Sequence, residues 1–468
     1  MARRRRQRRE VVAVAVAVPA RCAKISARRP LSGEKSIQDR SSGVPEESIN
    51  ENHYFRNQGR CGLNWRPYQT EREAQETIEQ YVREKGKKLL IDLYVSSTGD
   101  DTALLMSHDR GVNDPKIHEM AWDAFMAGTK VAKEQGLYGA GQDLLKDAFS
   151  GNIRGLGPAS CEIEFEERPN EPFVFFAADK TDPGAYNLPL YLAFCDPMHC
   201  SGLLLSPKMA KGFTFTIMDV NHTEGDRVID LNSPEELYDI ACLLRDNERF
   251  VVESIRSRAN NDVAAVVSTS RLHNIAGTYT GKDDPVCLVR TQGNFPATGE
   301  ILSPYRIGHY VAGTMRGSHH GPLIPVKFNS TVSFFDGPAI MSAAAFCVHN
   351  GKFTEPVDAF DHPFWDWVRN NVSQKAAEIR NQGFSGPAML PYSELEYGGV
   401  VEKMGQLDNA SSCARKKHTR RPATAATDAR RRRPSFRANN CKPNDLCGRV
   451  IRPVAGTSRT AAVFFGER

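Results

Sequence analysis

The sequence predicts one mixed domain, either α/β or α+β, between residues 70 and 397. Strand-like and helix-like segments alternate there, many strands are short, and no repeat of 20–50 residues is present. The chain has 468 residues, of which 40% are apolar, which is enough for a sizeable core. We therefore expect a single large domain of packed layers, flanked by segments 1–69 and 398–468.

The two flanking segments differ from the centre in charge. Residues 1–69 carry 15 Lys and Arg against 6 Asp and Glu, and residues 398–468 carry 16 against 5. The centre is acidic, with 30 against 45. Basic, low-complexity segments of this kind are typically disordered, and alone they would suggest nucleic acid or an acidic surface. The acidic centre suits divalent cations.

Other patterns limit the class of protein. No apolar run reaches the 18 residues of a membrane span. The 11 cysteines include no CxxC pair, and the group around Cys195, His199 and Cys200 lacks the second pair of a structural zinc site, so buried thiols are expected. The Arg-rich start and the apolar run from Val11 to Val18 fit either a targeting segment or unrelated sequence.

The first elements follow from periodicity. Apolar residues at helical spacing predict a helix over 73–86, which ends at a glycine. Residues 88–97 and 102–108 are predicted strands around the turn from Thr98 to Asp101, and a long helix follows over 116–134. Residues 137–152 are predicted to be a glycine turn and a short helix that ends at Ser150-Gly151-Asn152.

The later elements are mostly strands. Strict alternation over 161–167 indicates a half-buried strand, and the apolar segment 171–180 indicates a buried strand that stops at Asp179-Lys180. The remaining expected elements are strands over 212–220, 262–269 and 285–291, a helix that begins at Ser233, and a last helix over 364–381.

Polar clusters occur where the predicted strands end. Asp100-Asp101, Asp179-Lys180 and Lys282-Asp283-Asp284 all occupy such positions, where folds of this class place ligand groups. Five carboxylates brought together would repel one another, and Mg²⁺, which prefers oxygen ligands and binds phosphates, would relieve this. The alternative is that each cluster is a solvated turn.

Lys282 is a candidate amine nucleophile. At its reference pKa only about 1 lysine in 2,500 is neutral at pH 7, and two adjacent carboxylates would stabilise the ammonium further. If Asp283 and Asp284 bind Mg²⁺, the local field favours the free amine instead. Tyr279 is then a candidate proton donor and acceptor, whereas an exposed loop lysine is the alternative.

Several longer motifs occur in a fixed order. They are "LYGAGQDLLKDAFSGNIRGLGP", "ADKTDPGAYNLPLY", "IAGTYTGKDDPV", "MRGSHHGPL" and "LPYSELEY". From about Glu71 to Tyr397, the sequence closely resembles the archaeal-type fructose-1,6-bisphosphate aldolase/phosphatase family. The resemblance implies a four-layer α-β-β-α sandwich, a cytoplasmic homo-octamer and an enzyme of gluconeogenesis.

The resemblance also implies the chemistry. Members condense dihydroxyacetone phosphate with glyceraldehyde 3-phosphate through a Schiff base, and then hydrolyse the 1-phosphate of fructose 1,6-bisphosphate with Mg²⁺. It assigns Lys282 as the Schiff-base lysine and Tyr279 as the acid/base. The implied metal ligands are Asp100, Asp101, Gln142, Asp179, Asp283 and Asp284. The implied substrate contacts are Tyr138, Gly151, Asn152, Lys180, Gln292, Arg316, Asp336 and Tyr397.

The N-terminus departs from the family pattern. Members begin with a strand that carries Lys-Ala-Asp-(Val/Ile)-Gly and, seven residues after the Asp, a His. That Asp is a metal ligand and the phosphatase base. Nothing in residues 1–69 matches it. We therefore expect a weakened phosphatase and a sheet edge left open by the missing strand.

Two other functions remain as alternatives. A catalytically impaired family member could act only as an assembly subunit. A nucleic-acid-binding protein would use the arginine runs 3–9, 415–421 and 430–433, but no aromatic residues interleave with them and no known reader motif is present. Nucleic acid and membranes are therefore not the expected partners; sugar phosphates are.

Overall fold

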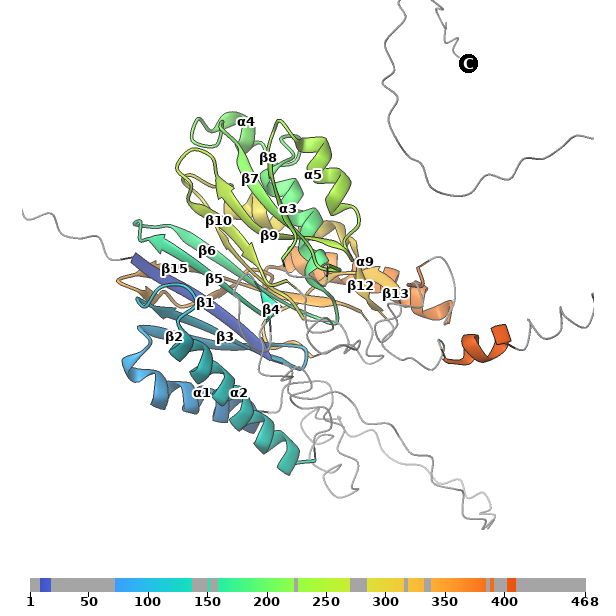
Figure 1. Cartoon of the computed structure of the whole chain (residues 1–468), viewed down its shortest axis with the longest axis horizontal. Coiled ribbons are helices and arrows are strands. Elements are labelled where there is room, and N and C mark those ends of the chain that lie inside the picture. The colour runs from blue at the N-terminus through green and yellow to red at the C-terminus, as the bar shows by residue number, and fades with distance from the viewer. Residues whose placement is uncertain are drawn as a thin grey trace, which may run out of the picture. The chain divides into compact units, whose positions relative to one another are not determined.

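Two β-sheets lie face to face at the centre of the molecule in the computed structural model (Figure 1). The structure describes residues 9–17, 72–136, 150–151, 159–222, 226–269, 284–314, 319–331, 338–383, 388–390 and 402–409. The chain divides into two compact units, 1–406 and 407–468. A helix over 402–409 crosses that boundary, and all elements below belong to the first unit.

The smaller sheet has five strands in the described part of the chain. Their order is β2 (Asp92–Thr98), β3 (Asp101–His108), β1 (Arg9–Ala17), β5 (Ala159–Glu166) and β4 (Ser150–Gly151). Except for the short parallel pair of β4 and β5, neighbouring strands are antiparallel.

The larger sheet is mostly antiparallel and has ten described strands. Its order is β14 (Ile324–Pro325), β15 (Ile340–His349), β6 (Pro172–Asp179), β11 (Val286–Arg290), β10 (Val263–Val267), β9 (Phe250–Ser257), β7 (Phe213–Asp219) and β8 (Val228–Asn232). The short strands β16 (Lys352–Phe353) and β17 (Val357–Asp358) pair with β15. A separate hairpin joins β12 (Tyr310–Gly313) and β13 (His319–Pro322).

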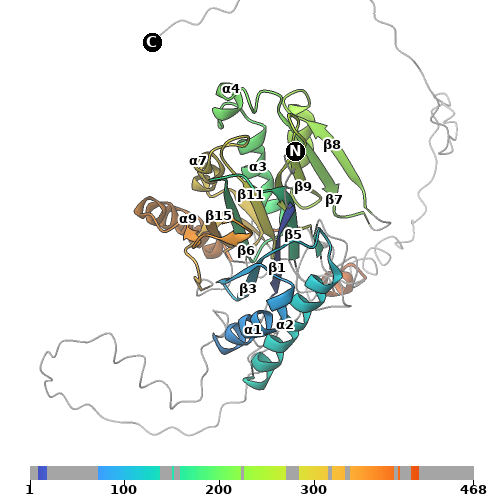
Figure 2. The same ribbon diagram turned by 90° about the vertical axis from the view of Figure 1, so that its left-hand side faces the viewer.

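Helices cover the outer face of each sheet (Figure 2). On the smaller sheet these are α1 (Arg72–Lys85) and α2 (Pro115–Glu134). On the larger sheet the longest are α3 (Asn187–Phe194), α5 (Leu237–Leu244) and α9 (Pro363–Asn381). The shorter helical segments are Gly86–Lys88, Pro183–Tyr186, α4 (Gly202–Leu205), α7 (Thr298–Leu302) and Ser303–Ile307. No described helix is both long enough and apolar enough to cross a bilayer.

The sequence of strand β6 is apolar because both faces of the strand are buried. Phe173 and Phe175 point into the core between the sheets, and Val174 and Phe176 point into the core beneath the helices of the larger sheet. Because successive side chains of a strand face opposite sides, a strand buried on both faces loses the alternating pattern. This confirms the expected buried strand that ends at Asp179-Lys180.

Helix α2 begins directly after its N-cap residue, Asp114. The carboxylate of Asp114 accepts hydrogen bonds from the N–H groups of Lys116 (2.9 Å) and Ile117 (3.3 Å), and Pro115 occupies the first helical position. Both features favour a helix start. The expected helix over 116–134 is therefore confirmed, as is the last helix, α9.

Strand β1 is the main difference from the expectation. It lies within the segment 1–69, which was expected to be largely without order, and it occupies the middle of the smaller sheet (Figure 1). Val11 and Val12 are buried. An alternating Val-Ala run has high strand propensity and fits between two long strands. The expected open sheet edge is therefore wrong, because β1 pairs with β3 on one side and β5 on the other.

Candidate active site

Three carboxyl groups converge at one end of the two sheets. One oxygen each from Asp100, Asp101 and Asp179 lies within 4.8 Å of the others, and all three side chains are buried. Asp100 and Asp101 come from the β2–β3 turn of the smaller sheet, whereas Asp179 ends β6 of the larger sheet. Asp284, just before β11, is 5% exposed and joins the group through Lys180. The site is thus built across both sheets.

The β2–β3 turn is fixed onto the larger sheet by short contacts. Gly99 adopts a φ of 63°, which allows the tight turn, and its N–H donates to the carbonyl of Ser330 (2.8 Å). The hydroxyls of Thr98 and Ser342 lie 2.6 Å apart, and Ser342 belongs to β15. These contacts position Asp100 and Asp101 against the end of β6.

The ends of β6 and β11 are joined at the site. The N–H of Ala178 donates to the carbonyl of Pro285 (3.1 Å), and the N–H of Lys180 donates to Oδ1 of Asp284 (2.6 Å). Lys180 has a φ of 67°, an uncommon conformation for a residue other than glycine. Strained backbone of this kind is often found at functional sites.

The backbone of Gly313 packs directly against the backbone of Lys180. A Cβ atom built on Gly313 would overlap the carbonyl oxygen of Lys180, and Gly313 has a φ of 127°. Only glycine combines this close approach with this conformation. The end of β12 therefore packs directly against the segment that carries Asp179 and Lys180.

We expect Gly313→Ala to disturb the carboxylate cluster strongly. The added methyl group would displace the Lys180 backbone and add strain at a positive φ, which together should lower the free energy of unfolding by about 3 kcal/mol or more. Urea unfolding and Mg²⁺ titration of the variant measure the two effects. Gly299→Ala is the matched control, because a Cβ at Gly299 meets nothing within 4 Å. Equal stability of the two variants would contradict the proposed role of Gly313.

The side chain of Lys180 lies among the carboxylates. Its Nζ donates to Oδ1 of Asp179 (2.7 Å) and also to Oδ1 of Asp100. Burial by itself lowers the pKa of Lys180, but the nearby carboxylates outweigh burial and raise that pKa well above its usual value. The ammonium group therefore stays charged.

The single ammonium of Lys180 does not neutralise the four carboxyl groups of the cluster. Burial, followed by repulsion from Asp284, Asp179 and Asp100, raises the pKa of Asp101 well above its usual value. Burial also raises the pKa of Asp179, against a smaller lowering by Lys180. Both carboxylate oxygens of Asp101 and Oδ2 of Asp179 are buried without a hydrogen-bond partner among the described residues. Unpartnered, crowded oxygens of this kind fit a hard divalent cation.

The described residues include only part of the predicted site. The structure brings together Asp100, Asp101, Asp179, Lys180 and Asp284. Gly151 lies in β4, which pairs with β5, and its substrate contact stays a prediction. The remaining predicted residues except Gln292 lie outside the described part of the chain: Tyr138, Gln142, Asn152, Tyr279, Lys282, Asp283, Arg316, Asp336 and Tyr397.

Gln292 does not join this cluster within one chain. Asp284 precedes β11 and Gln292 follows it, so the two residues flank opposite ends of the strand. The Nε2 of Gln292 instead approaches the hydroxyl of Thr298 (3.4 Å). The substrate contact expected for Gln292 stays a prediction.

Sequence analysis missed Ser342 and Gly313. Ser342 lies in an alanine-rich strand whose pattern does not separate strand from helix, and Gly313 shows its role only through the close approach of a distant segment. The position of Gly313 just ahead of the MRGSHHGPL motif was the one available signal.

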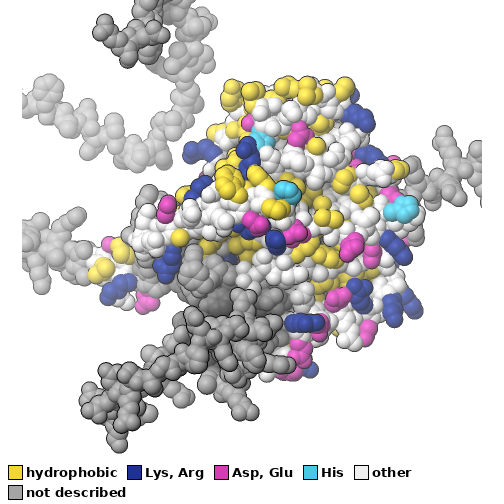
Figure 3. Space-filling model, turned by 180° about the vertical axis from the view of Figure 1, so that it is seen from behind, with side chains coloured by type: hydrophobic (Ala, Val, Ile, Leu, Met, Phe, Trp, Pro, Cys, Tyr) yellow, Lys and Arg dark blue, Asp and Glu magenta, His cyan; other side chains and the backbone are white. Residues whose placement is uncertain are grey.

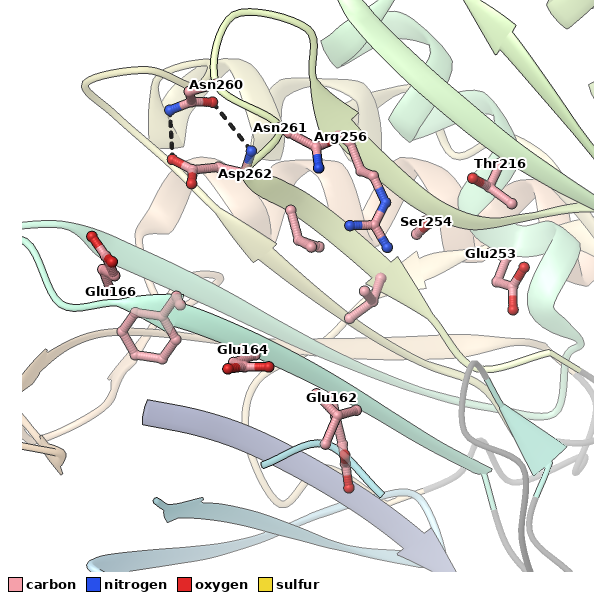
Figure 4. Close-up of a pocket in the computed structure, with 14 residues that line it drawn as sticks. Glu162, Glu164, Glu166, Thr216, Glu253, Ser254, Arg256, Asn260, Asn261 and Asp262 are labelled. Atoms are coloured by element: carbon pink, nitrogen blue, oxygen red, sulfur yellow. Dashed lines mark hydrogen bonds between the residues drawn. The ribbon is translucent and has the colours of Figure 1, made fainter. Parts of the chain in front are cut away.

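A cavity of about 730 Å³ lies elsewhere, between β5 and the strands β9 and β10 (Figure 4). Glu164 and Glu166 come from β5, and Arg256 and Asp262 come from the opposite side. None of the clustered aspartates lines it. We therefore place the candidate active site at the aspartate cluster.

Comparison with known proteins shows the family of the chain. The family model described as fructose-1,6-bisphosphatase matches residues 67–411. The chain is 57% identical over 335 residues to the fructose-1,6-bisphosphate aldolase/phosphatase of Thermus thermophilus, covering 72% of this chain and 92% of that protein. It is 50% identical over 324 residues to the protein of the same name from Ignicoccus hospitalis, covering 69% and 83%. The protein of that name from Moorella thermoacetica is 45% identical over 356 residues, covering 76% and 93%. The chain therefore belongs to the fructose-1,6-bisphosphate aldolase/phosphatase family.

Proposed function

We propose that this chain is a bifunctional, Mg²⁺-dependent fructose-1,6-bisphosphate aldolase and phosphatase of gluconeogenesis. The observation that carries the proposal is the buried aspartate cluster at the junction of two sheets, in a chain 57% identical to a protein of that name. The two sheets and the helices that cover them support the four-layer α-β-β-α sandwich that the resemblance implies.

Mg²⁺ fits the donor set better than a softer metal would. The described ligands are all carboxylate oxygens, and no described cysteine or histidine belongs to the group. Asp100, Asp101, Asp179 and Asp284 would hold the ions, with Gln142 and Asp283 as further ligands. When bound, Mg²⁺ would neutralise phosphate oxygens and supply a positive field at the site.

The aldolase half would use Lys282 as the nucleophile. Lys282 precedes Asp284 by two residues, so chain connectivity limits their Cα separation to about 7 Å. Its amine would attack the carbonyl carbon of dihydroxyacetone phosphate, and loss of water would give the imine. Tyr279 would move the proton during formation of the carbon–carbon bond with glyceraldehyde 3-phosphate.

The phosphatase reaction would take place at the same substrate-binding site as the aldolase reaction. Lys180 lies next to the cluster and would contact a phosphate group once its ammonium is available. The proposed further substrate contacts are Tyr138, Gly151, Asn152, Gln292, Arg316, Asp336 and Tyr397. Attack of water on phosphorus would release the 1-phosphate and leave fructose 6-phosphate.

Exposed apolar side chains support assembly with further copies. Around α4, Met198 is 90% exposed, Leu205 78% and Leu204 68%. In the space-filling view from behind, apolar side chains gather at this end of the molecule (Figure 3). Such clusters often mark protein interfaces. Together with the homo-octamer that the resemblance implies, this supports our proposal of a homo-octamer, which light scattering of the purified protein would test; we propose a cytoplasmic location for it.

The direct test is turnover by the purified chain. With Mg²⁺, triose phosphates should give fructose 6-phosphate and inorganic phosphate, and EDTA should stop both steps. An assembled protein without either activity would instead be a structural subunit. Salt-sensitive DNA binding without turnover would favour the nucleic-acid alternative.

A further inference from the structure

Lys180 combines a fixed backbone with a movable side chain. Its N–H donates to Asp284, its carbonyl lies against Gly313, and its φ is 67°. These restraints fix the Cα position. The four-carbon stem beyond it can rotate, and it carries the ammonium to Asp179 and Asp100.

The ammonium of Lys180 contacts two of the three carboxylates that a divalent cation would need. It takes Oδ1 of Asp179 and Oδ1 of Asp100, and these two residues belong to the three-carboxylate group. Mg²⁺ binds oxygens at about 2.0–2.1 Å in octahedral geometry and would bring two positive charges next to the ammonium. Mutual repulsion in a buried site opposes holding both cations on the same carboxylates.

We propose that Lys180 is a built-in counter-ion of this metal centre, displaced when Mg²⁺ binds. Before metal binding, its ammonium offsets part of the repulsion among Asp100, Asp101, Asp179 and Asp284, and so holds the cluster together. After metal binding, the ammonium is free to meet an anionic phosphate group. Lys180 is thus a positioning residue that couples metal occupancy to phosphate binding.

This inference rests on the proposed metal-dependent function, and it gives Lys180 a role in the metal-free protein. A residue that only contacts substrate would leave Mg²⁺ affinity unchanged when replaced. A competing counter-ion must change that affinity, because its removal deletes a positive charge from the metal position. The two roles therefore differ in a binding measurement made without substrate.

The test compares Lys180→Met with the wild-type protein by calorimetric titration of Mg²⁺. We expect the variant to bind Mg²⁺ at least about tenfold more tightly, because no ammonium must be displaced. Without metal, its midpoint of thermal unfolding should fall, and Mg²⁺ should restore it. Lys180→Arg keeps the charge and should stay near wild type in affinity. Lys130→Met is the matched control, because Lys130 is exposed on α2 and its removal changes the net charge equally.

A measurement on the wild-type protein covers the case in which Lys180→Met does not fold. Acetic anhydride labelling, read by mass spectrometry, should modify Lys180 faster with Mg²⁺ than with EDTA, while Lys130 labels equally in both. Unchanged labelling, or weaker Mg²⁺ binding by Lys180→Met, would overturn the counter-ion role. Absence of any Mg²⁺ binding by the wild-type protein would instead overturn the proposed function itself.

Discussion

Replacing Lys282 by arginine is expected to abolish imine formation with dihydroxyacetone phosphate. Arginine stays protonated at any pH at which the protein is folded, so it offers no free electron pair to the carbonyl carbon. Loss of the covalent route should lower the aldolase rate by about 10⁴-fold or more. Borohydride trapping followed by peptide mass spectrometry measures the adduct directly.

Wild-type protein should carry the trapped adduct on Lys282 when Mg²⁺ is present. Lys130→Arg is the control, because it makes the same change on an exposed helix face and should leave trapping intact. An adduct on a different lysine would reassign the nucleophile. Loss of the Lys282 adduct in Asp284→Asn would further connect the carboxylate cluster to the neutrality of the amine.

The phosphatase is expected to be the weaker of the two activities. The resemblance implies an Asp carried by the first strand as a metal ligand and general base. Strand β1 occupies the central position in the sheet but ends at Ala17, opposite Thr102, and the next residues are Val18, Pro19 and Ala20. None of them is acidic. Loss of a general base typically costs about 10²–10⁴-fold in rate.

A single substitution at the end of β1 tests this expectation. Val18 directly follows Ala17, the last described residue of β1, and Ala17 pairs with Thr102, the neighbour of Asp101 along the chain. Val18→Asp should therefore raise the phosphatase rate, whereas the uncharged Val18→Asn should not. Replacing residues 1–69 by a strand that bears both the Asp and the His should raise it further. A wild-type phosphatase as fast as the aldolase would mean that Asp100 or Asp101 already acts as the base.

Local patterns predicted the elements whose burial is regular along the chain. The alternation over 161–167 predicted β5, the apolar segment 171–180 predicted β6, and helical spacing predicted α2 and α9. The half-buried character expected for β5 is wrong, because residues 159–163 are all buried. Strand β15 was missed, because an alanine-rich segment has no clear period. By its sequence alone, the run Val11–Val18 fits a targeting segment or unrelated sequence. Its role as a strand depends on pairing with β3 and β5, which are distant in the sequence.

The sequence by itself determined the family, through long motifs in a fixed order, and it marked the acidic strand ends as the site of chemistry. Only the tertiary structure decided that Asp100 and Asp101 meet Asp179 across two sheets, that the ammonium of Lys180 lies between them, and that Gly313 holds its backbone. Lys180 is 80 residues from Asp100 and 104 from Asp284. The physical reason is that periodicity reflects the burial of a single element, whereas these contacts depend on how distant strands pair and stack.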